Sequence, residues 1–273
     1  MEDSPRKVAM IIGAMKCGTS SLYDYLIDHP AIAACIRKEP EFFSENQGHK
    51  FPVDDYWDLW PDFDPAVHTY VLEASTGYTK YPAEPNVVAN VAAAGLAPKF
   101  IYVVRNPIQR IESHYHHMNT ANSTWRNTLL GPGMIEVSNY FLQLQRWQEK
   151  FPRDDFLVLD FADLAADPRA VVGRACAFLG LSDPPERESY DVQNRAQSRR
   201  SLTTVLRRHN MNRTLRAIPQ PVMDAANELV HRVRPLKKKR LSTAQRDQVF
   251  TALAPDMKRL SEEYGIDVSR WGF

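Results

Sequence analysis

The sequence predicts an α/β fold in which a mainly parallel β-sheet is flanked by helices on both faces. Short apolar runs rich in β-branched or aromatic residues recur at 8–12, 70–73, 99–104 and 156–159. Segments with the apolar spacing of helices lie between these runs, and strands that alternate with helices form parallel sheets. The chain has 273 residues, of which 44% are hydrophobic and 25% charged, and we expect one globular domain over 1–273.

The first half of the chain begins with a strand at 8–12 that ends at Gly13. Thr19-Ser20-Ser21 offer N-caps for a helix that continues to Ile27, and His29-Pro30 ends it, because the residue before a proline disfavours helix. The following elements are an extended segment at 31–36, a short aromatic helix and loop at 54–64, a strand at 70–73 and a helix at 84–94.

In the second half, the run KFIYVV at 99–104 gives the strongest strand signal. Asn106 as N-cap and Pro107 at the first helical position begin a helix directly after it. The later elements are a helix at 134–150, a strand at 156–159, a helix at 168–179, an irregular basic region from about 182, and a last helix at 243–264.

The stretch VAMIIGAMKCGTSS at 8–21 predicts a strand, a glycine-bearing loop and a helix. This arrangement directs backbone N–H groups and the positive end of a helix to one point, which suits a phosphate. Lys16 adds a full charge there. The order K-C-G-T differs from the G-x-x-x-x-G-K-[ST] loop of nucleoside triphosphatases. The alternative is an ordinary strand–helix turn with a solvated lysine.

Lys16-Cys17-Gly18-Thr19 resembles the 5′-phosphosulfate loop, K-x-G-T, of the sulfotransferases that use 3′-phosphoadenylyl sulfate (PAPS). The resemblance implies a P-loop NTPase-like three-layer fold, with PAPS as donor and 3′-phosphoadenosine 5′-phosphate (PAP) as product. It also implies that the donor is bound by Lys16, Cys17, Gly18, Thr19 and Ser20, and that Lys16 takes part in catalysis.

A second candidate anion site follows the strand at 99–104. Arg105 stands at the carboxyl end of this strand, where open α/β sheets bind ligands. Ser113 lies about 140° round the next helix from the core residue Ile108, at ~100° per residue, so it does not face the core. RNPIQRIESHY resembles the second sulfotransferase motif, whose Arg and Ser hold the 3′-phosphate of PAPS. The alternative is an arginine paired with a carboxylate and a solvated serine.

The segment Lys38-Glu39-Pro40-Glu41-Phe42-Phe43 supplies a candidate base. Pro40 predicts an extended Glu39, so Glu39 and Glu41 project to one side. The segment resembles the K-E-P-H-F-F motif of heparan-type and related carbohydrate sulfotransferases, which implies that Glu39 is the general base. Glu41 stands where those enzymes have His. We hypothesise that the two carboxylates raise each other's pKa and that Glu41 poises Glu39.

The segment Glu73-Ala74-Ser75-Thr76-Gly77-Tyr78 stands where the heparan-type enzymes carry E-K-T-P-A-Y, with Ala74 in place of their functional lysine. The candidate acceptor-site residues are Lys38, Glu41, Glu73, Ser75 and Tyr78, and a structural role is an equal alternative for the last three.

A segregated basic segment lies at 192–223, with seven arginines and no Asp or Glu. Such segregation in a chain of net charge +1 points to an anion. Bacterial carbohydrate-type sulfotransferases are similar here, with a loop that closes over the nucleotide. This resemblance implies that Arg199 and Arg200 contact the donor.

Cofactor metals and targeting segments are not indicated. The three cysteines are unclustered, and His114, His116 and His117 lie on different helix faces, so we expect no metal. The N-terminus MEDSPRK is too polar for a signal peptide, and no apolar run reaches the ~20 residues that span a bilayer, so a cytoplasmic location is expected. The net charge of +1 gives no information about partners, and no nucleic-acid partner is expected.

Together, the motifs predict a PAPS-dependent sulfotransferase that moves a sulfuryl group to a hydroxyl or amine of a saccharide or other small-molecule acceptor by in-line displacement. A nucleotide kinase of related fold is one alternative, opposed by the missing G-x-x-x-x-G-K and by Arg105 where kinases carry an acid that helps hold Mg²⁺. A non-catalytic binder of nucleotide or polyanion is another, which Glu41 and Ala74 leave open.

Overall fold

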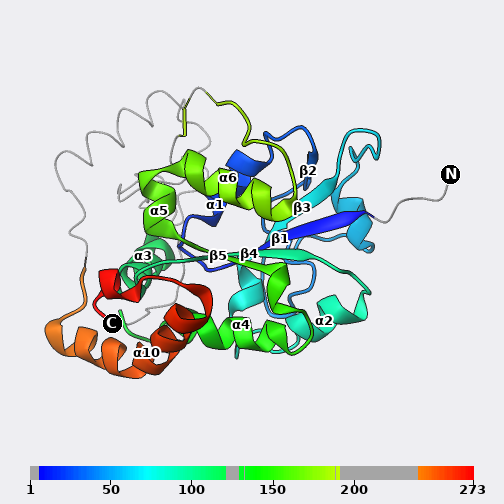
Figure 1. Ribbon diagram of the computed structural model, residues 1–273. Helices are drawn as coiled ribbons and strands as arrows, with labels where there is room; N and C mark the ends of the chain where they lie inside the picture. The colour runs from blue at the N-terminus through cyan, green and yellow to red at the C-terminus, as the bar shows by residue number, and fades with distance from the viewer. Residues whose placement is uncertain (1–5, 121–128, 132, 188, 191–238) are drawn as a thin grey trace, which may run out of the picture.

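The computed structural model describes residues 6–120, 129–131, 133–187, 189–190 and 239–273. In this part of the chain, one five-stranded parallel sheet has the order β2-β3-β1-β4-β5. Its strands are β1 (Lys7–Gly13), β2 (Ile32–Ala34), β3 (Tyr70–Ala74), β4 (Lys99–Val104) and β5 (Phe156–Asp160). Helices cover both faces of the sheet (Figure 1), so the predicted α/β class is confirmed.

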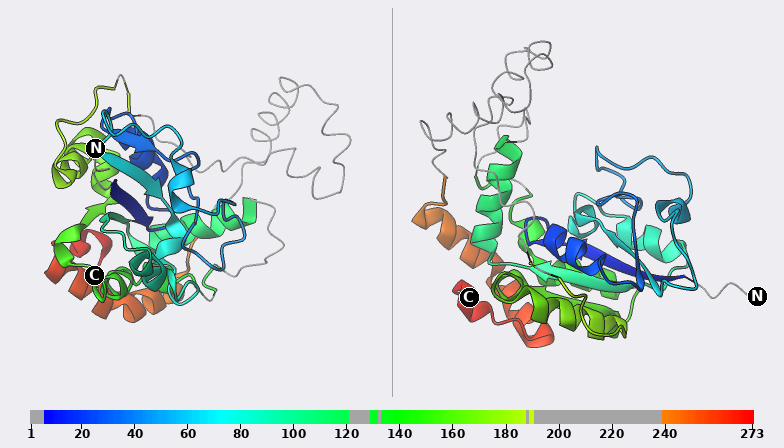
Figure 2. Two further views of the ribbon diagram at one scale, coloured as in Figure 1. Left: turned by 90° about the vertical axis from the view of Figure 1, so that its right-hand side faces the viewer. Right: turned by 90° about the horizontal axis from the view of Figure 1, so that it is seen from above.

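The helical layers come from different parts of the chain. One face carries α1 (Thr19–Leu26), α5 (Phe161–Ala166) and α6 (Pro168–Leu179), and the other carries α2 (Val87–Ala93), α4 (Tyr140–Gln148) and α10 (Thr243–Tyr264) (Figure 1). The helix α3 (Pro107–Thr120) follows β4 directly. The C-terminal helix α10 packs against α4 and α3 (Figure 2).

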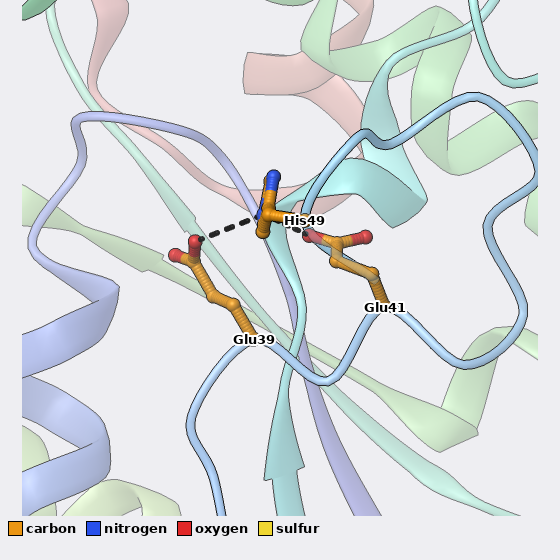
Figure 3. Close-up of side chains that lie close together, drawn as sticks. All are labelled: Glu39, Glu41 and His49. Carbon is orange, nitrogen blue, oxygen red and sulfur yellow. Dashed lines mark ion pairs between the residues drawn. The ribbon is translucent and has the colours of Figure 1, made fainter. Parts of the chain in front are cut away.

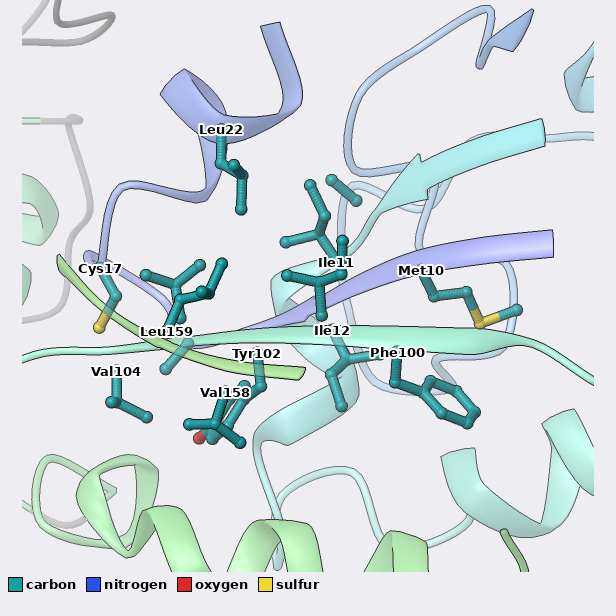
Figure 4. Packing of buried hydrophobic residues seen from close by; sticks show 14 of the residues in the cluster. Met10, Ile11, Ile12, Cys17, Leu22, Phe100, Tyr102, Val104, Val158 and Leu159 are labelled. Carbon is teal, nitrogen blue, oxygen red and sulfur yellow. The ribbon is translucent and has the colours of Figure 1, made fainter. Parts of the chain in front are cut away.

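The core lies on both faces of β1 and β4, which is why these strands read as unbroken apolar runs rather than as alternating ones. Ile11 and Ile12 of β1 are both fully buried although they point to opposite faces. Figure 4 shows Leu22 of α1 on one side of the sheet and Tyr102 and Val158 on the other.

The strand order brings three strand ends to one edge. β1 pairs with β3 on one side and with β4 on the other, all parallel. The carboxyl ends of β3, β1 and β4 therefore lie next to one another, about 4.8 Å apart from strand to strand. The segments after β1 and β4 contain Lys16 and Arg105, and the segment after β2 reaches the end of β3 through a hydrogen bond from the Glu39 amide to the Ala74 carbonyl.

Most predicted elements are present, and the differences have local causes. The helix expected at 134–150 begins only at Tyr140, because a separate 3-10 turn, Glu136–Ser138, precedes it. The helix expected at 84–94 is confined to Val87–Ala93. The helix α5 was not predicted, and it begins where the Asp160 side chain accepts a hydrogen bond from the Ala162 amide. Arg199 and Arg200 lie outside the described residues.

Candidate active site

The loop between β1 and α1 is built around Gly18. This residue is the N-cap of α1 and has φ +87°, a left-handed conformation that L side chains rarely adopt. A Cβ atom at Gly18 would also lie only 2.7 Å from the Phe161 ring. The predicted capping by Thr19, Ser20 or Ser21 is therefore wrong, since the glycine takes that place without a side-chain cap.

Without a side-chain cap, the first amides of α1 keep their hydrogen-bonding capacity. The Leu22 amide donates the first intrahelical bond, to the Gly18 carbonyl at 3.1 Å, so the amides of Thr19 and Ser20 before it lie at the N-terminus of the helix, ahead of its hydrogen-bonding pattern. The loop itself is pinned by a bond from the Ala14 amide to the Val103 carbonyl, at 2.8 Å. A rigid set of N–H groups at a helix N-terminus is suited to an anion.

The members of the K-C-G-T loop differ in where their side chains lie. Lys16 is half-buried, whereas Cys17 and Thr19 are buried. The Cys17 Sγ faces the Tyr140 hydroxyl at 3.9 Å, and burial raises the pKa of this thiol to about 11. Cys17 can therefore serve an anion only through its backbone, while Lys16 is the loop residue with a charge to offer.

Lys16 lies close to both of the other predicted key residues. Burial lowers the pKa of Lys16, and the negative charge of Glu39 is the largest opposing influence. The Lys16 carbonyl accepts a hydrogen bond from Arg105 Nη1 at 3.2 Å. Lys16, Arg105 and the candidate base Glu39 are predicted from three separate motifs, and the structure brings them together at one edge of the sheet.

Arg105 is held in place by neutral groups. It contacts Gln109 Oε1 through Nε and Nη2, both at 3.3 Å, and its guanidinium lies over the Phe161 ring at 4.4 Å from the centroid. No carboxylate pairs with Arg105 among the described residues. Burial lowers the pKa of Arg105, because partial desolvation disfavours the charged form and no carboxylate in the described part of the chain offsets it. Within the described residues, the alternative of a strand-end arginine paired with an acid therefore has no support.

The helix that carries Ser113 begins as predicted. The Asn106 side chain accepts a hydrogen bond from the Gln109 amide at 3.2 Å, and Pro107 is the first helical residue. Ser113 is half-buried on this helix. Its joint role with Arg105 on one anion stays a prediction.

The backbone at Glu39 and Glu41 differs from the prediction. Both residues are left-handed, with φ +57° and +54°, so the expectation of an extended Glu39 is wrong. Long-range hydrogen bonds account for this. The Glu39 amide donates to the Ala74 carbonyl at 2.9 Å, and the Glu41 amide donates to Ser75 Oγ at 3.1 Å. The two carboxylates nevertheless approach one common side chain, His49 (Figure 3).

Glu39 is surrounded by cations. Its Oε1 pairs with Lys38 Nζ at 2.9 Å and accepts a bond from Thr76 Oγ1 at 3.4 Å. Burial pushes the pKa of Glu39 upward, but Lys38, followed by Lys80 and His49, holds it below its usual value. Glu39 is therefore ionised and able to accept a proton at neutral pH. Besides burial, the charge of Glu39 raises the pKa of Glu41, as hypothesised, whereas the cations outweigh any opposite influence on Glu39, and the poising of Glu39 by Glu41 stays a prediction.

Glu41 is instead a buried structural carboxylate. It is 0% exposed, and its oxygens accept bonds from Ser44 Oγ at 2.6 Å and from the Gly77 amide at 2.8 Å. A Cβ atom at position 77 would overlap the Glu41 carboxylate, so only glycine permits this contact. Burial raises the pKa of Glu41. Its side chain therefore anchors the segment after Pro40 to the turn after β3.

Comparison with known proteins identifies the family. A family profile described as "Sulfotransferase domain" matches residues 6–217. The chain belongs to the sulfotransferase domain family. It is 26% identical over 203 residues to the mouse bifunctional heparan sulfate N-deacetylase/N-sulfotransferase 4, covering 63% of this chain and 22% of that protein. It is 30% identical over 187 residues to the human heparan sulfate glucosamine 3-O-sulfotransferase 3B1, covering 63% and 46% of the two chains.

This sulfotransferase domain thus spans less than half the length of these curated relatives. Among solved structures, a sulfotransferase from Alicyclobacillus acidocaldarius matches with a TM-score of 0.66 and 23% identity, covering 99% of this chain and 100% of that one. The likeness supports the P-loop-like α/β fold. No helix in the described part of the domain is long and apolar enough to cross a bilayer.

The residues predicted from the E-K-T-P-A-Y position lie in the core of the sulfotransferase domain. Glu73 and Ser75 are 0% exposed and Tyr78 is 2% exposed. The Tyr78 hydroxyl accepts a hydrogen bond from the Phe43 amide at 3.3 Å and donates one to Glu73 Oε2 at 3.4 Å. This burial favours the structural role over acceptor contact for all three. Lys38, in contrast, is partly exposed beside Glu39.

Several residues at the site were not singled out from the sequence. Lys80 follows the turn η2 (Thr76–Thr79), and its charge lowers the pKa of Glu39. On α3, burial and the charge of Lys16 lower the pKa of His117, and the charge of Glu39 acts in the opposite direction. These residues carry no motif. One feature of the sequence could have pointed to Lys80. Ala74 stands where related enzymes have a lysine, and Lys80 is the next lysine after it.

A buried arginine fixes another histidine on α3. Arg110 is 0% exposed; it donates to Ser138 Oγ at 2.6 Å, and Nη1 lies 3.3 Å from His114 Nδ1. Burial, with the Arg110 charge, lowers the pKa of His114 to about 3. His114 is therefore neutral, and Nδ1 is the nitrogen that accepts from Arg110.

Among the described residues, one group could hold a metal ion: Glu39, Glu41 and His49, whose possible ligand atoms lie within 4.8 Å of one another. Lys38 already binds Glu39, and Ser44 and Gly77 occupy the oxygens of Glu41. These contacts, with the nearby Lys80 charge, oppose a cation at this point. The expectation that the reaction uses no metal stays a prediction.

Proposed function

We propose that this domain is a PAPS-dependent sulfotransferase that transfers a sulfuryl group to a hydroxyl or amine of an acceptor, by in-line displacement with Glu39 as general base. The observation that supports this proposal best is the convergence of Lys16, Arg105 and Glu39 at the carboxyl ends of three adjacent strands. Each comes from a different motif, and each offers the charge that its proposed role needs.

The donor fits the positive groups of the site. Lys16 and the amides of Gly18, Thr19 and Ser20 are proposed to bind the 5′-phosphosulfate, with Cys17 contributing its backbone alone. Arg105 and Ser113 are proposed to bind the 3′-phosphate, and the lack of an acidic partner for Arg105 within the described residues supports this. Arg199 and Arg200, outside those residues, stay predicted donor contacts.

The chemistry follows from the charges of the chain. Glu39, kept ionised by Lys38 and Lys80, takes the proton of the acceptor as its oxygen or nitrogen bonds to sulfur. Lys16 and the loop amides stabilise the negative charge that grows on the departing phosphate. Donors fixed in place before the reaction act most strongly on charge that develops in the transition state. No step in this scheme calls for a metal.

A carbohydrate or glycosylated small molecule is the proposed acceptor. The K-E-P-x-F-F segment is similar to that of carbohydrate sulfotransferases, and the curated relatives are named for heparan sulfate. Because Glu73, Ser75 and Tyr78 are buried, we propose Lys38, which is partly exposed beside Glu39, and Lys80, whose charge acts on Glu39, as contacts of the acceptor. We also propose a single domain over 1–273 and a cytoplasmic location.

Thermal unfolding with PAP, with and without Mg²⁺, tests the donor site. Ligand at ~100 times its Kd adds about 2.7 kcal/mol, or roughly 5–11 °C in Tm for a domain of this size. A metal-independent shift with PAP supports the proposal, and a shift seen only with ATP and Mg²⁺ would support the kinase instead.

Transfer of label from ³⁵S-PAPS to a panel of oligosaccharides then tests the chemistry. Glu39→Gln is expected to keep the PAP shift and to lose transfer by about 10²–10⁴-fold. Glu262→Gln on the exposed face of α10 is the matched control and should transfer normally. A wild-type chain that binds PAP but labels nothing on the panel would support the non-catalytic alternative.

A further inference from the structure

His49 lies between the two glutamates of the base segment. Its Nε2 is 3.8 Å from Glu39 Oε2 and 4.0 Å from Glu41 Oε1 (Figure 3). It comes from the loop after Phe43, not from the base segment itself, and its side chain is 49% exposed. An exposed histidine that meets two carboxylates at once is not explained by core packing.

The two carboxylates have different mechanical roles. Glu41 is fixed, since it is fully buried and both of its oxygens are bound by Ser44 and Gly77. The Glu39 side chain is 33% exposed and held by Lys38, itself a long side chain that is partly in solvent. His49 therefore connects an immobile carboxylate to the one that must be aimed at the acceptor.

The base segment also departs from its relatives at this point. The K-E-P-H-F-F pattern carries an imidazole two residues after the base, whereas here that position is Glu41, whose carboxylate is directed into the core. The imidazole next to the proposed base comes instead from His49, which is eight residues after Glu41 and ten residues after Glu39. The chain thus retains an imidazole beside the base through a different segment.

We propose that His49 is the positioning residue of the base: braced by Glu41, its imidazole orients the Glu39 carboxylate toward the acceptor. This inference rests on the proposed function of Glu39. At 3.8 Å the contact is longer than a hydrogen bond, so it acts electrostatically: an imidazolium pairs with the carboxylate, and the N–H dipole of a neutral imidazole is attracted to it. Aim matters because a misplacement of about 1 Å at a reacting group costs up to ~10²-fold in rate.

Other charged groups act on Glu39 as well, and the test must separate them. Lys38 belongs to the same segment, Lys80 follows η2, Lys16 stands on the β1–α1 loop, and His117 faces the site from α3. Glu41 is the neighbouring acid. None of these is altered by replacing His49 with glutamine, which keeps a polar side chain but has no imidazole to bridge the two carboxylates.

The first experiment compares His49→Gln with the wild type and with His68→Gln, a histidine bound to the Asp64 amide on the loop before β3. In the oligosaccharide transfer assay, His49→Gln should lower kcat by about tenfold, within the range expected for misplacement. Its Tm and PAP shift should stay at wild-type values, and the KM for PAPS should change little. His68→Gln should match the wild type. A wild-type kcat for His49→Gln would overturn the proposal.

The second experiment does not depend on turnover. Carbon-13 NMR of the Glu39 side-chain carboxyl, assigned by loss of its signal in Glu39→Gln, gives the pKa of Glu39 in the full chain. Since His49 helps to hold this pKa down, His49→Gln should raise it, whereas His68→Gln should not. An unchanged value would refute the contact. A wild-type chain that neither binds PAP nor transfers label would refute the proposed function, while this titration would still decide whether His49 acts on Glu39.

Discussion

Replacing Glu73 with glutamine isolates the cost of a carboxylate inside the core. Glu73 is fully buried in β3; among the described residues its Oε1 has no hydrogen-bond partner, and its Oε2 accepts a hydrogen bond from the Tyr78 hydroxyl at 3.4 Å. Burial, more than any neighbouring charge, raises the pKa of Glu73 to about 8. In the unfolded chain the same group titrates near about 4.3.

The sign of the effect follows from these two pKa values. Below pH ~4 both states are protonated, and Glu73 adds no pH dependence. Between about 4.3 and 8 the unfolded chain has lost a proton that the folded chain keeps, so the free energy of unfolding falls as pH rises. At about 1.36 kcal/mol per pH unit, the loss reaches up to about 4 kcal/mol by pH 7. This corresponds to roughly 8–16 °C in Tm.

The assay is thermal unfolding of the wild type and of Glu73→Gln at pH 4, 6, 7 and 8, followed by far-UV circular dichroism. The difference in Tm should be small at pH 4 and should grow in favour of the variant up to pH 8. Because Asp256, whose pKa burial raises to about 6, titrates in both proteins, it cancels in the difference.

Glu73→Leu is the matched control. It also lacks a titrating group, so its difference curve should have the same shape, displaced by a constant for the lost Tyr78 contact. A difference for Glu73→Gln that does not vary with pH would refute the reasoning, because it would mean that Glu73 is already ionised in the folded state across this range.

Three further predictions concern the groups around the base. Gly77→Ala places a Cβ on the Glu41 carboxylate, so we expect the free energy of unfolding in urea to fall by about 1–3 kcal/mol and kcat to fall as well. Gly48→Ala is the control and should have little effect, because a Cβ there meets nothing. Lys80→Met removes a charge that lowers the pKa of Glu39, so the acidic limb of the kcat–pH profile should move to higher pH; an unmoved limb would exclude Lys80 from the site. Arg110→Met leaves the Ser138 hydroxyl and the Met134 carbonyl without their buried donor, and should cost about 2–4 kcal/mol in urea unfolding, with wild-type stability contradicting the assignment.

Local signals in the sequence predict the strands and several helix boundaries well. The run at 99–104 and the Asn106-Pro107 start of α3 are examples, because apolar β-branched runs and caps act within a few residues. Gly18 as the cap of α1 was not predictable in this way. The Phe161 ring, far away in the sequence, closes the space around it.

The candidate site shows the same division between local and long-range causes. The motifs identify Lys16, Glu39 and Arg105 as residue types, and the structure brings them together. The left-handed backbone of Glu39 depends on its bond to the Ala74 carbonyl, which no local pattern encodes. His49 reaches the base from a loop without periodicity, and its position follows from the folded chain as a whole.

The strand order gives a physical reason why these three groups meet. The Lys16 loop continues from β1, Arg105 directly follows β4, and the Glu39 amide is bonded to the last residue of β3. Because β1 lies between β3 and β4, the lysine stands between the base and the arginine, at spacings of about one strand each. A sheet with β1 at its edge would keep every motif intact and yet separate the base from the loop. The site therefore depends on the order β3-β1-β4 as much as on the motifs themselves.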